Sequence, residues 1–114
     1  DSVVAALEKN STENQFRVLH VHNVKQTLAE KGFQREPLKI IEVCNAGFAH
    51  KALGQDVAVA LFMPCKFAVW TERGQTHVSL GRPSMISQML PQAHLESLAS
   101  EVETTLKRVM QESV

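Results

Sequence analysis

The sequence predicts an α+β domain with two layers, in which helices pack on one face of a mainly antiparallel sheet. Three observations lead to this class. Residues 16–22 alternate strictly between two sets of side chains, which is typical of a strand. Residues 65–72 and 76–80 flank a tight turn at 73–75 and form a predicted hairpin. Residues 95–114 carry Leu, Val and Met at helical spacing and form the longest predicted helix.

The first half of the chain is expected to alternate short helices and strands. Asn23 and Asn45 precede helical segments, and an asparagine side chain readily accepts a hydrogen bond from a free amide at a helix N-terminus. Gly32 and Gly54 follow these segments, where glycine favours the left-handed conformation that ends a helix. Polar residues at 10–14 favour a turn. The predicted helices are residues 2–8, 24–31 and 46–53, and the predicted strands are residues 16–22 and 38–44.

The second half contains the hairpin and two further helices. Residues 57–61 are nearly all apolar, which is expected of a short buried strand or of the end of a connection. Pro64 separates this segment from the hairpin, and residues 81–83 end the hairpin. Residues 84–90 form a short predicted helix before Pro91. Neither a repeat nor a low-complexity segment occurs, so we expect residues 1–114 to form a single domain.

The composition argues against several functions. The 12 basic and 12 acidic residues give a net charge of zero and are well mixed, whereas nucleic-acid binding needs a concentrated basic face. The longest apolar stretch, Val57 to Met63, is too short to cross a bilayer, and no leader peptide is recognised. Two cysteines are too few for a disulfide scaffold. We therefore expect a cytoplasmic protein, with the periplasm as the alternative, and neither nucleic acid nor membrane as a partner.

Residues 41–69 contain three distinctive motifs, EVCN at 42–45, AHKAL at 49–53 and LFMPCKFAV at 61–69. With these motifs the segment resembles the Domain-of-Unknown-Function-302 family. The resemblance continues through the hairpin, Arg82-Pro83 and the closing helix, so it covers nearly the whole chain. One departure is Ala46, which stands where the family has a proline after the asparagine.

The family resemblance implies a fold similar to the TATA-box-binding-protein class, with a curved antiparallel sheet and helices on one side. It also implies a homodimer and no known reaction, and a fold class by itself carries no function. The family has a strand before its first helix, so we expect that the sequence starting at Asp1 lacks that strand.

Cys44 and Cys65 mark the predicted site. Cys44 ends one strand just before a helix, and Cys65 begins another strand after a proline. A thiol at a helix N-terminus has a lowered pKa, which favours a redox-active or ligand-binding pair. The alternative is that both cysteines are buried small hydrophobes. The spacing matches neither a thioredoxin motif nor a zinc ribbon.

Three histidines are further candidates. His20 and His22 share one face of their predicted strand and, with Cys44 and Cys65, would form a copper or zinc site, although an accidental pair is the better explanation of so short a pattern. A soft metal ion and haem are the cofactors considered. His50 follows Cys44 on the next helix and would border a pocket with Cys44, Asn45 and Cys65.

Other functional interpretations have less support. A cysteine nucleophile needs a base held by a third group, for which His50 and Glu42 are the candidates beside Cys44. Trp70 is expected to anchor the core or a dimer interface, and Met63 is expected to pack. We therefore expect a non-enzymatic domain that binds a small ligand or metal near the cysteines. The alternatives are a thiol-redox or persulfide-carrying protein and a structural dimerisation module.

Overall fold

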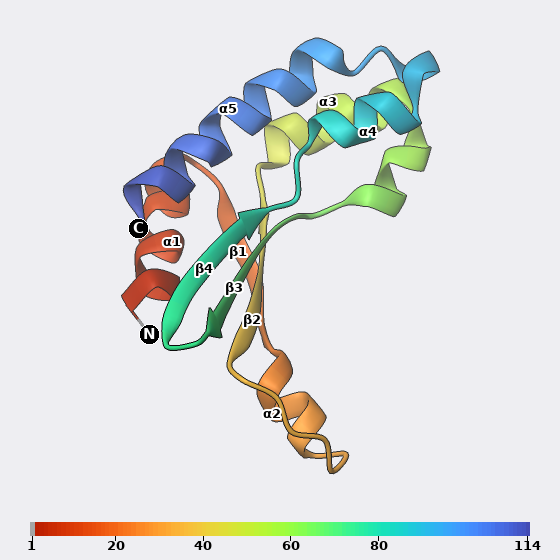
Figure 1. Cartoon of the computed structure of the whole chain (residues 1–114). Helices are drawn as coiled ribbons and strands as arrows, with labels where there is room; N and C mark the ends of the chain where they lie inside the picture. The colour runs from red at the N-terminus through yellow and green to blue at the C-terminus, as the bar shows by residue number, and fades with distance from the viewer. Residues whose placement is uncertain (1) are drawn as a thin grey trace.

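A computed structural model describes residues 2–114 and confirms the α+β class (Figure 1). Four strands form one open antiparallel sheet in the order β1-β2-β3-β4. The strands are β1 (Arg17–Asn23), β2 (Leu38–Cys44), β3 (Cys65–Glu72) and β4 (Gln75–Leu80). The helices are α1 (Ser2–Glu13), α2 (Val24–Ala29), α3 (Ala46–Gln55), η1 (Val57–Phe62), α4 (Ser84–Met89), η2 (Pro91–Ala93) and α5 (Glu96–Glu112).

Local sequence signals explain several element boundaries. The side-chain oxygens of Asn23 and Asn45 each accept a backbone hydrogen bond at 3.1 Å, from Gln26 and Phe48 respectively, so both predicted caps are confirmed. Glu72 pairs with Gln75, which leaves a two-residue turn between β3 and β4. Both turn residues have positive φ, as the tightest hairpin turns require.

Four local predictions are wrong. The strict alternation predicted for residues 16–22 is interrupted by a β-bulge between Val18 and His20, which turns His20 and His22 to the face opposite that of Val18. Residues 10–14 do not form a turn throughout, because α1 continues to Glu13 and buries Ser11 completely. Residues 57–61 form the 3₁₀ helix η1 and not a strand, because the Asp56 carboxylate accepts a hydrogen bond from the Ala58 amide at 2.9 Å. Gly54 does not end α3, which continues to Gln55.

The main core lies between one face of the sheet and the helices α1 and α5 (Figure 1). Its fully buried side chains come from α1, the sheet and α5, and they include Leu7, Ile41, Phe67 and Leu106, each 0% exposed. A smaller cluster around Val59, Ala93 and Leu95 joins η1, α4 and η2 to the start of α5. The site described below lies between these two clusters.

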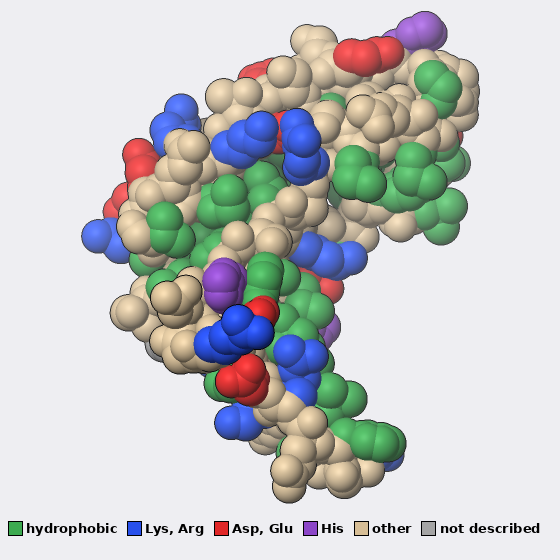
Figure 2. Space-filling model, viewed as in Figure 1, with side chains coloured by type: hydrophobic (Ala, Val, Ile, Leu, Met, Phe, Trp, Pro, Cys, Tyr) green, Lys and Arg blue, Asp and Glu red, His purple; other side chains and the backbone are tan. Residues whose placement is uncertain are grey.

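The lobe formed by η1 and α4 carries exposed apolar side chains. Figure 2 shows hydrophobic side chains gathered on this part of the surface, and Val57, Leu61, Met85 and Met89 are 56–82% exposed. At the opposite end, β1, α2 and β2 form an arm that extends away from the core (Figure 1), and α2 contains no buried residue. Within residues 2–114, no helix is long and apolar enough to cross a membrane.

Candidate functional site

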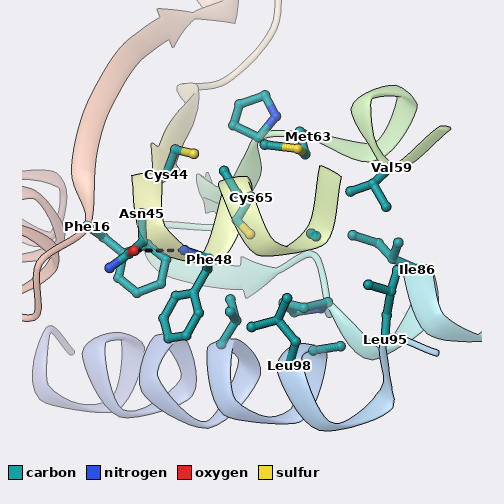
Figure 3. A pocket seen from close by; sticks show the side chains of 16 residues that line it. Phe16, Cys44, Asn45, Phe48, Val59, Met63, Cys65, Ile86, Leu95 and Leu98 are labelled. Carbon is teal, nitrogen blue, oxygen red and sulfur yellow. Dashed lines mark hydrogen bonds between the residues drawn. The ribbon is translucent and has the colours of Figure 1, made fainter. Parts of the chain in front are cut away.

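A cavity lies at the end of the sheet where β2 stops and β3 begins, between α3 and α5 (Figure 3). Its volume, measured for the centre of a water-sized sphere, is about 70 Å³. The wall is lined by Phe16, Cys44, Asn45, Phe48, Ala49, Ala52, Val59, Met63, Pro64, Cys65, Pro83, Ile86, Leu95, Leu98, Ala99 and Val102. The predicted residues Cys44, Asn45 and Cys65 therefore line one cavity.

The two cysteines lie on neighbouring strands, but they are out of register by one residue. Cys65 pairs with Val43, which precedes Cys44 in β2. Because side chains alternate along a strand, the register directs the two thiols toward opposite faces of the sheet. Both cysteines are free thiols.

Burial controls the protonation of both thiols. Desolvation raises the pKa of Cys44, and it raises the pKa of Cys65 to about 11, with a smaller upward contribution from Cys44 and a lowering by Lys66. The direction for Cys44 is the reverse of the lowered pKa expected from the helix N-terminus. The Asn45 side chain, and not the thiol, accepts the hydrogen bond of the α3 amide at Phe48. Both thiols are therefore protonated at neutral pH.

Asn45 holds the cavity wall together through both of its polar atoms. Its Oδ1 accepts the hydrogen bond from the Phe48 amide at 3.1 Å, and its Nδ2 donates to the Gln15 carbonyl at 3.0 Å. The side chain thus joins the start of α3 to the loop before β1. Its hydrogen-bonding groups are engaged within the protein, so Asn45 shapes the cavity.

The histidines lie away from the cavity. In the β1–β2 ladder Arg17 pairs with Cys44, while His20 and His22 pair with Glu42 and Ile40. A β-bulge in β1 places His20 and His22 beside residues two and four positions before Cys44 in β2, which at 3.3 Å per residue is about 7 and 13 Å along the strand from Cys44. The structure does not bring Cys44, Cys65, His20 and His22 together, and within residues 2–114 no group of three or more His, Cys, Asp or Glu is placed to hold a metal ion.

The catalytic arrangement considered for Cys44 is not assembled either. Glu42 Oε2 lies 2.9 Å from His22 Nε2, so this carboxylate contacts a β1 histidine. His50 is exposed on α3 and is not one of the residues that line the cavity. The Cys44–His50–Glu42 combination therefore has no support in the geometry.

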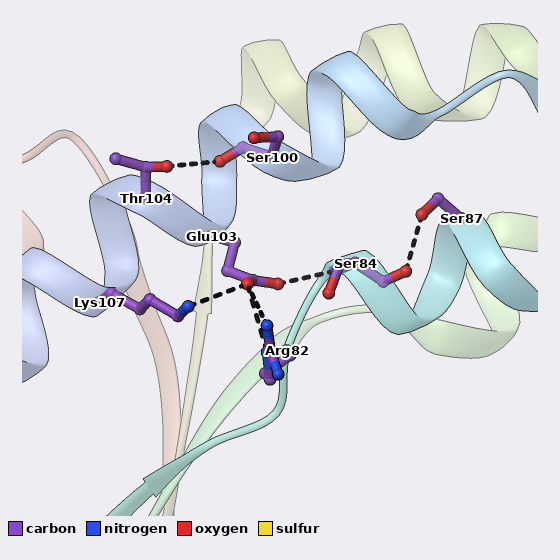
Figure 4. A network of polar contacts seen from close by, with 7 residues as sticks. All are labelled: Arg82, Ser84, Ser87, Ser100, Glu103, Thr104 and Lys107. Carbon is purple, nitrogen blue, oxygen red and sulfur yellow. Dashed lines mark hydrogen bonds and ion pairs between the residues drawn. The ribbon is translucent and has the colours of Figure 1, made fainter.

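Sequence reasoning missed a polar cluster beside the cavity, centred on Glu103 (Figure 4). Glu103 Oε1 accepts a hydrogen bond from the Ser84 amide at 3.0 Å, and Oε2 contacts Arg82 and Lys107, both at 3.2 Å. Glu103 is 7% exposed. The hydrogen bonds from Ser84, followed by the contacts with the two cations, lower the pKa of this carboxyl to about 2. The available signal was an acidic residue next to Val102 on the apolar side of the last helix.

The comparisons with known proteins identify the family. A crystal structure of an uncharacterized conserved protein DUF302 from Bacillus stearothermophilus matches with a TM-score of 0.93 and 30% sequence identity. The match covers 98% of this chain and 88% of that chain. No curated protein matches the chain. The model of the domain of unknown function DUF302 matches residues 1–113, and the chain therefore belongs to the DUF302 family.

Proposed function

We propose that this protein is a non-enzymatic binding domain that takes a small, uncharged, mainly apolar ligand into the cavity bordered by Cys44, Asn45 and Cys65. The observation that carries the proposal is the chemistry of the wall. Within the described chain, the residues that line the cavity include no charged side chain, and nearly all are hydrophobic. Apolar concave sites of this kind are the usual binding places for small molecules.

The wall selects against charged ligands. An ionised group moved from water into such a cavity without a partner loses its hydration at a large free-energy cost. Asn45 is engaged with Phe48 and Gln15. The remaining polar groups of the side chains are the two thiols, which are weak hydrogen-bond donors when protonated. The ligand is therefore held by shape and by removal of apolar surface from water.

The volume limits the size of the ligand. The cavity of about 70 Å³ is half of a roughly 150 Å³ apolar cavity that is known to bind benzene. A ligand of a few carbon atoms fits without movement of the wall. A larger ligand requires one wall to move.

A ligand titration followed by ¹H–¹⁵N NMR tests the proposal with 1-butanol as the probe. The Ala52→Leu variant fills the cavity, and Ala46→Leu adds the same side chain at an exposed position of the same helix. We expect saturable shifts at cavity residues in the original protein and in Ala46→Leu, and a loss of these shifts in Ala52→Leu. Equal shifts in both variants, or no saturable shift in the original protein, would contradict the proposal.

A second candidate is a soft monovalent metal ion, favoured by the sulfur atoms of Met63 and Cys65, which line the same cavity (Figure 3). Cys44 also borders this cavity, but the strand register directs its thiol toward the other face of the sheet. Thiolate and thioether ligands favour Cu(I) over harder ions. Binding would release one proton from each thiol that coordinates the metal.

Competition with a chromophoric Cu(I) chelator tests the metal candidate. The original protein should remove one equivalent of Cu(I) from the chelator, while Cys65→Ser should not. Met63→Leu should weaken retention, and Met89→Leu, an exposed methionine on α4, serves as the control. Failure of the original protein to compete for Cu(I) would eliminate this candidate. The raised thiol pKa values give less support to the thiol-redox alternative, because the thiolate is the reactive form.

A further inference from the structure

One wall of the cavity is formed by the short helix α4, whose side chains are at most partly buried, and by Pro83 before it. Pro83 and Ile86 belong to this wall and come from the end of the β4–α4 connection and from α4. Helix α4 has six residues, and none of them is fully buried. Its outer side chains Met85 and Met89 are more than half exposed. Apolar packing therefore attaches this wall less firmly than it attaches the walls formed by the sheet and α5.

A single carboxylate on α5 holds the start of this segment. Glu103 Oε1 accepts the Ser84 amide hydrogen bond at 3.0 Å, while Oε2 accepts from Arg82 Nε and Nη2 at 3.3 and 3.2 Å (Figure 4). Pro83, at the N-cap of α4, provides no side-chain cap. The Glu103 carboxylate, which belongs to α5, therefore acts as the N-cap of α4. It connects the residues on both sides of Pro83 to α5.

The attachment of α4 to α5 depends on the negative charge of Glu103, because two cations surround this carboxylate. Arg82 and Lys107 both contact Oε2 at 3.2 Å. Hydrogen bonds to a charged and mostly buried group are stronger than those between neutral groups. Removal of the carboxylate leaves two cations close together and an amide without its acceptor, and both changes favour separation of α4 from α5.

The attachment point lies next to the cavity. Val102 precedes Glu103 in α5 and lines the cavity, as does Ala99 one turn earlier. Across the cavity, Cys65 lines the end that belongs to the sheet. A displacement of α4 would thus open the cavity on the side opposite the sheet and increase the solvent access of Cys65, which is only partly exposed in the closed structure.

We propose that Glu103 is a positioning residue that latches α4 over the cavity, and that residues 82–90 form the gate through which ligand enters. This inference rests on the proposed binding function of the cavity. It explains how a cavity with little free volume admits a ligand: the wall with the weakest packing is fixed by one polar cluster.

Labelling of Cys65 by a thiol reagent measures the opening of the gate without any ligand. All proteins carry Cys44→Ser, so that Cys65 is the single reactive residue. In that background Glu103→Ala should increase the labelling rate at least tenfold, and Glu103→Gln should give a smaller increase because its amide oxygen still accepts the Ser84 hydrogen bond. The control Glu101→Ala removes an exposed carboxylate from the same helix and should change the rate less than twofold.

Amide hydrogen exchange distinguishes gate opening from general loss of stability. In Glu103→Ala, exchange should accelerate at residues 84–90, while the amides of β2 and β3 keep their protection. An unchanged labelling rate in both Glu103 variants would overturn the proposal, as would equal acceleration throughout the sheet and α4. Because neither measurement uses a ligand, their failure is distinguishable from a failure of the binding proposal, which the 1-butanol titration reports.

Discussion

Cys65 lies directly opposite Val43 in the antiparallel β2–β3 ladder, so Cys44 is one residue out of register with it. The two thiols consequently face different sides of the sheet at the same end of the same two strands. This relationship explains why the two cysteines remain free thiols although both border one cavity. Strand pairing places the two cysteines at the same end of the sheet, and burial keeps their thiols protonated.

The stability of the protein should fall in acid in a way that depends on Glu103. The folded pKa of Glu103 is about 2, below the 4.5 of an unperturbed glutamate. Its contribution is therefore complete above about pH 4.5 and is lost as the pH falls toward 2. Allowing for solvent screening, we expect this contribution to be roughly 1–3 kcal/mol. The free energies of unfolding measured with urea for the original protein and for Glu103→Gln should differ at pH 7 and converge near pH 2. A difference that stays constant with pH would contradict the assignment.

Cys65 should become reactive only in strong alkali. Its pKa of about 11 leaves almost no thiolate at pH 7.5 in the folded protein. A folded pKa raised above the unfolded value of 9.0 contributes stability below pH 9 that is lost as the pH rises toward 11. The labelling rate of Cys65 in a Cys44→Ser background should increase steeply between these pH values. A plateau of labelling already reached at pH 8 would show that the thiol is not desolvated.

Asn45 should matter more to stability than Asn23, although both cap helices. Asn45→Ala removes the Phe48 cap and the bond to Gln15, and the loss of a cap typically costs about 1 kcal/mol. Asn23→Ala removes the cap of α2, a helix with no buried residue. We expect a clear decrease in the urea midpoint for Asn45→Ala and a smaller one for Asn23→Ala. A larger decrease for Asn23→Ala than for Asn45→Ala would mean that α2 contributes more to stability than its exposure indicates.

Homodimerisation remains a proposal, and the outer face of the sheet is where we place it. Trp70 stacks on His77 with ring centroids 5.4 Å apart, on the face opposite the buried Val69. Aromatic side chains are enriched at protein interfaces. Sedimentation velocity over a range of concentrations should show a dimer that Trp70→Ala weakens. A protein that stays monomeric at every concentration rules the dimer out.

Local signals in the sequence predict the sheet and most helices well. The caps at Asn23 and Asn45 depend on neighbouring residues, so they can be recognised without knowing the fold. The bulge in β1 depends on its pairing with β2, so the alternation of the sequence did not reveal it. The extension of α1 also depends on distant residues. Asn10 Nδ2 donates to Ser113 Oγ at 2.9 Å across the whole chain, which stabilises a polar segment that would otherwise favour a turn.

The candidate site was only partly predictable for the same reason. Cys44, Asn45 and Cys65 carry local signals at chain reversals, and they line one cavity, whereas His50 does not. The opposite walls come from α4 and α5, whose positions follow from tertiary packing. Glu103 could be recognised as important only once Arg82 and Ser84 were placed beside it.

A crystal of the protein pressurised with xenon tests the central claim most directly, because xenon binds in dry apolar cavities. The account predicts a xenon atom in the cavity among Cys65, Ile86 and Ala99, and its loss in Ala52→Leu. A cavity that contains ordered water and no xenon, or xenon only at other places, would contradict the claim that this protein binds an apolar ligand there.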